Sequence, residues 1–148
     1  MRIAVFRVVV AAALVATGYV AGRIDGIEPV ARAQAPAGRV FEMRTYTTNE
    51  GKLPTLNTRF RDHTMKFFTK YNMTNIGYWT PQDGPLAQNT LIYIIAHESR
   101  DAAKANWAKF QADPEWVKVR TESEVNGKIL VKSPDSVFLV PTDYSPIK

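Results

Sequence analysis

The sequence contains no cysteine and only two histidines, His63 and His97, which lie far apart in the chain. The lack of cysteine excludes disulfides, thiol catalysis, cysteine metal sites and a lipidated cysteine anchor. Stability must then come from apolar burial, with oligomerisation as a second source. The sequence also lacks HExxH and HxH spacings, so no set of metal ligands is predicted.

Other motifs are missing too. There is no glycine-rich phosphate loop and no GxSxG elbow, which speaks against nucleotide cofactors and serine hydrolysis. The formal charge of +5 includes residues 1–33, and the remainder holds 15 basic and 12 acidic residues without a Lys/Arg cluster. We therefore expect no cofactor and no binding to nucleic acid.

No apolar run reaches the roughly 20 residues of a membrane-spanning helix, but the N-terminus carries a shorter one. Two arginines precede an apolar segment at residues 8–22, and a small-residue cleavage pattern follows at residues 31–33, as in export signals. The long spacing between the two leaves an uncleaved membrane anchor as the alternative. We expect an exported protein, periplasmic or secreted, with residues 1–33 as signal peptide or anchor and residues 34–39 as linker.

Residues 40–148 carry the pattern of one folded domain. Apolar positions at spacings of three and four predict a helix from Leu53 to Tyr71, while Ser99 and Asp113 are expected to cap a second helix and its continuation. Segments rich in β-branched and aromatic residues predict four strands, at residues 40–48, 74–81, 89–97 and 136–142. This order predicts an α+β fold, a ferredoxin-like βαββαβ antiparallel sheet with two helices on one face.

The second face of this sheet has no cover within the predicted domain. Val40, Ile92, Ile94 and Val137 or Leu139 offer more apolar surface than two helices can hide. A second copy of the sheet would cover it, and closed two-fold pairs are the commonest assembly. A homodimer with face-to-face sheets is therefore expected.

Five segments, in this order, resemble the NIPSNAP family: FEMRTYTTNEGKL, RFRDHTMKFFTKYNM, IGYWTPQDGPLAQNTLIYI, SRDAAKANWAKFQADPEWVKV and PTDYSPIK. The resemblance covers about residues 40–148. It implies a dimeric α+β barrel, similar in fold to cofactor-free monooxygenases and isomerases, while eukaryotic members are linked to protein interactions. It supplies no agreed catalytic residues, and Tyr93 lies near the place where members often carry a histidine.

His63 is the candidate catalytic residue. It lies on the apolar stripe of the first helix, where it is either a packed core histidine or a general base facing a pocket between helix and sheet. Glu42, Arg44 and Tyr46 share one strand face and would suit an anion or carbonyl ligand. The alternative for these three is a solvated face or an ion pair at the dimer seam.

Tyr78 and Trp79 are predicted on opposite faces of their strand, one in the core and the other lining a pocket or the dimer seam. His97, at the end of its strand, is expected to be exposed. The predicted ligand-binding residues are Arg44, Tyr46, Trp79 and Tyr93.

Two functions follow from these residues. The leading hypothesis is an exported NIPSNAP-like dimer that binds a small apolar ligand or a protein partner. The alternative is a cofactor-independent monooxygenase or isomerase with His63 as base and Arg44 and Tyr46 stabilising an oxyanion. This alternative needs His63, Arg44 and Tyr46 to line one cavity. If Phe41 and Met43 face the helices, Arg44 and Tyr46 point to the other side of the sheet and cannot meet His63.

Overall fold

The structure, a computed structural model, describes residues 38–148, so the predicted export segment and residues 34–37 of the predicted linker lie outside the described residues. One antiparallel sheet has the order β2-β3-β1-β4, built from β1 (Val40–Thr47), β2 (Thr74–Trp79), β3 (Thr90–His97) and β4 (Asp135–Leu139). This confirms the predicted ferredoxin-like order of strands and helices.

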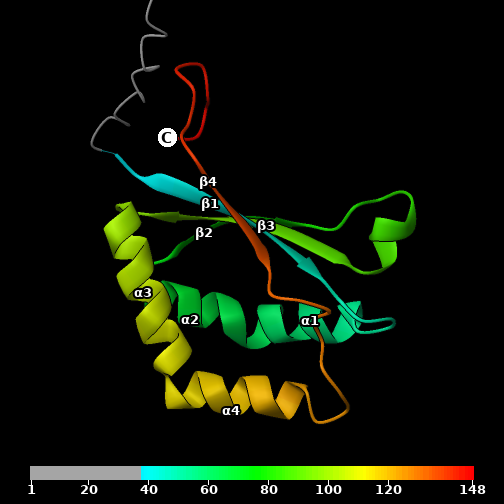
Figure 1. Cartoon of the computed structure of the whole chain (residues 1–148). Helices are drawn as coiled ribbons and strands as arrows, with labels where there is room; N and C mark the ends of the chain where they lie inside the picture. Colours follow the sequence, from blue (N-terminus) through cyan, green and yellow to red (C-terminus); the bar gives the residue numbers. More distant parts are fainter. Residues whose placement is uncertain (1–37) are drawn as a thin grey trace, which may run out of the picture. The chain divides into compact units, whose positions relative to one another are not determined.

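The main helices follow β1 and β3 in the chain, and one short 3-10 helix lies between β2 and β3. They are α1 (Leu53–Arg59), the π-helical turn η1 (Phe60–Thr64), α2 (Met65–Lys70), the 3-10 helix η2 (Pro85–Gln88), α3 (Arg100–Ala112) and α4 (Pro114–Ser123). Figure 1 shows α1, α2 and α4 together on one side of the sheet, with α3 leading from the sheet toward α4. Within residues 38–148, no helix combines the length and the apolar character that a membrane crossing requires.

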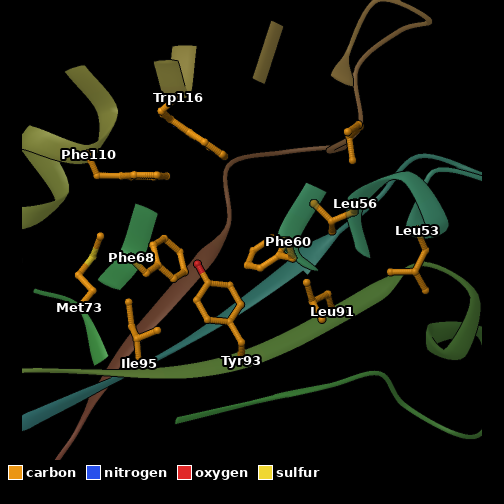
Figure 2. Packing of buried hydrophobic residues seen from close by; sticks show 11 residues of the cluster. Leu53, Leu56, Phe60, Phe68, Met73, Leu91, Tyr93, Ile95, Phe110 and Trp116 are labelled. Carbon is orange, nitrogen blue, oxygen red and sulfur yellow. The ribbon is translucent and has the colours of Figure 1, made fainter. Parts of the chain in front are cut away.

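The core lies between this helix layer and the sheet. Tyr93 and Ile95 point from β3 toward the helices and are fully buried. The Tyr93 ring packs against Phe60 and Phe68, with ring centroids 5.2 and 5.8 Å apart (Figure 2). Burial of each such side chain stabilises the fold by about 1.5–3 kcal/mol. The cluster also includes Leu53, Leu56, Met73, Leu91, Phe110, Trp116 and Ile129.

Among residues 38–148, no helix covers the opposite face of the sheet, and we call it the open face. Met43 of β1 lies between Ile94 of β3 and Val137 of β4 on this face. The odd-numbered residues of β1, including Phe41 and Met43, therefore lie on the open face and do not face the helices. Val40 was predicted on the uncovered face, and this is wrong. Val40 pairs with His97 and lies on the same side of β1 as Glu42 and Arg44, which face the helices.

The first helix is interrupted by one wide turn. Leu56, Phe60, Thr64 and Phe68 are buried, whereas His63 is exposed. The prediction that His63 lies on the buried stripe is wrong because the π-helical turn adds one residue and moves the inward position to Thr64.

Both predicted helix caps are confirmed. The Ser99 hydroxyl accepts a hydrogen bond from the Ala102 amide at 3.0 Å at the start of α3. The Asp113 carboxylate accepts from the amides of Glu115 and Trp116, at 2.7 and 3.3 Å, at the start of α4. These bonds satisfy amides that have no partner within a helix.

Candidate functional site

A buried carboxylate, Glu42, is the centre of a polar cluster between the sheet and the helices. Glu42 is 2% exposed. The Trp107 indole donates to Oε2 at 2.7 Å, and His97 Nε2 lies 3.0 Å from the same oxygen. Ser136 donates to Oε1 at 2.6 Å, as does Arg44 Nη1 at 2.8 Å. Residues of β1, β3, α3 and β4 thus meet at one side chain.

These contacts keep Glu42 ionised. Burial alone would raise the pKa of Glu42, but hydrogen bonds from His97, Ser136 and Trp107 and the charge of Arg44 outweigh it. The pKa of Glu42 falls to about 2. Glu42 is therefore a fixed negative charge at neutral pH rather than a group that exchanges protons during a reaction.

Arg44 is the partly open member of the cluster, with 15% of its side chain exposed. Its guanidinium lies over the Trp107 ring, with Cζ 4.3 Å from the ring centroid, a cation-π arrangement. Burial opposes the charge of Arg44, yet the nearby Tyr46, Tyr93 and Glu42 raise its pKa. Arg44 Nε is buried and has no hydrogen-bond partner among residues 38–148.

Tyr46 and Tyr93 lie beside Arg44 on the helix-facing side. The Tyr93 hydroxyl donates to the Tyr46 oxygen at 3.1 Å, and burial raises the pKa of Tyr93 well above its usual value. The structure therefore brings three predicted ligand-binding residues together. The expectation of a solvated face or dimer seam for Glu42, Arg44 and Tyr46 is wrong, because this parity of β1 faces the helices.

Trp79, the fourth predicted ligand-binding residue, lies on the other side of the sheet. It pairs with Ile92 on the open face and is 52% exposed. Its ring covers Gly77, where an added Cβ would come within 2.5 Å of the Trp79 Cη2 atom. Tyr78 points the opposite way and stacks on Tyr93 with centroids 5.4 Å apart, which confirms the predicted opposite faces of Tyr78 and Trp79.

His63 lines a separate shallow groove of about 240 Å³ between α1 and α4, together with Arg59 and Val119. In the described part of the chain, it shares no hydrogen bond and no cavity wall with Arg44 or Tyr46. The groove that His63 lines therefore includes neither Arg44 nor Tyr46. The role of His63 as a base stays a prediction.

The open face carries an apolar groove of about 350 Å³. Strand residues form its floor, and the chain after β4 forms one wall. Its lining residues are Phe41, Ile76, Ile94, Leu139, Val140, Pro141, Thr142, Ser145 and Ile147. The groove is of a size that suits a small molecule.

Sequence reasoning missed several members of the polar cluster. His97, predicted to be exposed, is 1% exposed, and its alternation with Tyr93 and Ile95 was the signal that could have placed it inward. Trp107 was not among the predicted site residues, and nothing in the sequence indicated Ser136. Within residues 38–148, no three acidic or histidine side chains gather as metal ligands would.

The family model described as NIPSNAP matches residues 41–146. A NIPSNAP family protein of unknown function from Agrobacterium tumefaciens is similar at 21% identity and a TM-score of 0.65, covering 76% of this chain and 96% of that chain. A NIPSNAP domain protein from Burkholderia xenovorans is similar at 29% identity and a TM-score of 0.59, covering 72% and 98%.

A more distant likeness is to SnoaB, a cofactor-independent oxygenase from Streptomyces nogalater, at 14% identity and a TM-score of 0.47, covering 74% of this chain and 99% of that chain. A likeness this weak carries no argument about function. No curated protein matches the chain.

Proposed function

The chain belongs to the NIPSNAP family, and on this premise we propose that its domain forms a homodimer through the open face and binds a small apolar molecule there. The observation that carries the proposal is the apolar groove beside an uncovered apolar sheet. The polar cluster on the other face does not enter this proposal.

The composition of the open face supports a second copy as its cover. Trp79 and Val137 are 52% and 49% exposed. Asp135 is the charged strand residue on this face, and it is already paired with Lys132 at 2.8 Å. A solvated face of an antiparallel sheet normally alternates to polar residues. Uncovered apolar surface of this kind marks an interaction site, and a two-fold pair would hide the same surface on both copies.

The groove supports the ligand class. Its volume of about 350 Å³ falls within the range of small-molecule pockets. The groove is lined by apolar side chains such as those of Phe41, Ile94 and Leu139, and none of its lining residues is charged. Within the groove, the ligand would therefore be held by apolar contact rather than by an ion pair. A protein segment in place of the small molecule is the competing occupant. The catalytic alternative with His63 finds no support in the position of that residue.

A matched pair of variants tests the dimer and the ligand site together. Ile94→Asp puts a charge on the open face, whereas Val125→Asp changes a residue that is 79% exposed and lies outside the sheet. We expect sedimentation to give a dimer for the native chain and Val125→Asp at micromolar concentration, and a folded monomer for Ile94→Asp. Saturable binding of decanol, followed by methyl chemical shifts, should be lost with Ile94→Asp alone.

Circular dichroism checks that both variants fold. A monomeric native chain, or a dimer that survives Ile94→Asp, would contradict the assembly. Decanol binding that is equal in both variants would contradict the ligand site.

A further inference from the structure

The apolar groove of the open face has a cation at its edge. Arg39 precedes Phe41 by two residues, and its Cζ lies 5.9 Å from the centroid of the Phe41 ring, which is part of the groove lining. Residues two apart in an extended chain lie on the same side, so Arg39 follows Phe41 to the open face. The Arg39 charge therefore lies within reach of a ligand that rests on the Phe41 ring.

A second groove of about 310 Å³ adjoins the apolar one at this place. Three residues of the chain after β4 (Figure 1) line both grooves: Val140, Pro141 and Thr142. The second groove differs from the first because charged residues line it, namely Arg39, Asp143 and Lys148. Small-molecule sites combine an apolar lining with a few placed polar groups that fix the direction of the ligand. The two neighbouring grooves together have this composition.

Arg39 is the cation of the second groove whose donors are uncommitted in the described part of the chain. Lys148 Nζ donates to the backbone carbonyl oxygens of Thr142 and Asp143. Arg39 is exposed, and no carboxylate of residues 38–148 forms an ion pair with it. Arg39 also borders a groove of about 730 Å³ that holds Glu98, but the two side chains are not paired. The Arg39 guanidinium can therefore bind an anionic group of a ligand.

Resting on the proposed function, we propose that the ligand of the apolar groove is a carboxylic acid whose apolar chain lies in the groove and whose carboxylate binds Arg39. A guanidinium matches a planar carboxylate with two parallel hydrogen bonds. The nearby Asp143 disfavours a second negative charge, so the head group is a carboxylate rather than a phosphate. Apolar burial supplies the affinity of the chain, and Arg39 fixes its direction along the groove.

Decanoate and decanol test this proposal, because they share a chain length and differ in the head group. Each is titrated into the full chain at neutral pH and followed by methyl chemical shifts. We expect Arg39→Gln to weaken decanoate binding about fivefold, the upper range for an exposed ion pair, and to leave decanol binding unchanged. Higher salt should likewise weaken decanoate binding alone. Arg61→Gln is the matched control, because Arg61 is exposed and lies in η1, outside both grooves.

The outcomes separate this proposal from the proposed function. If neither probe binds the native chain, both are overturned. If decanol binds but decanoate affinity is unchanged in Arg39→Gln, or falls equally in Arg61→Gln, the apolar groove stands and the assigned carboxylate is overturned. Tighter binding of decylamine or of decyl phosphate than of decanoate would also overturn the carboxylate. Circular dichroism of each variant separates loss of binding from loss of fold.

Discussion

Glu42 is the residue whose chemistry is most tightly fixed by its neighbours. Burying a carboxylate is costly unless donors compensate for the lost water. Here the donors come from three strands and α3, so removing the charge affects the sheet and its contact with α3 together. Glu42 is thus a structural charge that also orients Arg44.

Acid should weaken this contribution of Glu42. A carboxylate whose folded pKa is depressed stabilises the fold above its unfolded pKa, and this stability is lost as pH falls through the folded value. For Glu42 this stability is lost as pH falls from 4.5 to about 2. A pKa shift of this size corresponds to about 3 kcal/mol of folding free energy. We therefore expect Glu42→Gln to lower the urea unfolding free energy by about 3 kcal/mol at pH 7 and by much less near pH 2.

The control for this prediction is Glu50→Gln, which changes an exposed carboxylate in the turn after β1. Its unfolding free energy should follow that of the native chain across the same pH range. A Glu42→Gln deficit that stays constant from pH 7 to pH 2 would show that charge is not what Glu42 contributes.

The polar cluster shows which site features the sequence could reveal. Period-two alternation placed Glu42, Arg44 and Tyr46 on one face of a strand, and this is confirmed. Which face turns to the helices depends on tertiary packing, because both sets of β1 residues contain large side chains. The prediction that His97 is exposed is wrong because the alternation of β3, in phase with Ile95, turns its side chain inward even at the end of the strand.

Among the elements, the first helix departs most from its expected form. Its apolar spacing predicted one buried stripe, and a helix does run from Leu53 to Lys70. The π-helical turn η1 changes the phase midway, so Thr64 turns inward and its hydroxyl donates to the Arg59 carbonyl at 3.1 Å. Periodicity detects a helix and its mean direction, but a single inserted residue is invisible to it.

Deletion of His63 should therefore be tolerated. Without it, Phe60, Thr64 and Phe68 have spacings of three and four, which keeps all three on one face of a regular α-helix. We expect the unfolding free energy to change by no more than about 1 kcal/mol, as measured by urea titration.

Deletion of Lys104 from the middle of α3 is the comparison. It rotates Ala103 by about 100° relative to Phe110 and should disrupt packing. If both deletions destabilise the protein equally, η1 is not a single inserted residue in an otherwise compatible helix.

The remaining elements were more predictable, since each has a local cause. Ser99 and Asp113 cap helices because their side chains accept from amides at the helix starts. The four strands follow β-branched and aromatic segments, and their order in the sheet agrees with the ferredoxin-like expectation. Local chemistry thus determined the boundaries, and the connection lengths restricted the topology.

For the whole domain, the two faces of the sheet differ in what they need. The helix-facing side is closed over a core that includes a charged cluster, whereas no part of residues 38–148 covers the apolar side chains of the open face. We propose that a second copy and a small apolar molecule complete this face, and that the protein is exported with residues 1–33 as signal or anchor. Assembly and ligand are properties of the whole molecule that no single element reveals.

Native mass spectrometry of the protein purified from the cells that make it tests these proposals most directly. We predict a mass of two chains with a retained apolar molecule that dissociates under activation. A subunit mass that lacks residues 1–33 would support cleavage of the export signal, and an intact mass would support the anchor. A ligand-free single chain at micromolar concentration would contradict the central claim that the open face is completed by a second copy and an apolar ligand.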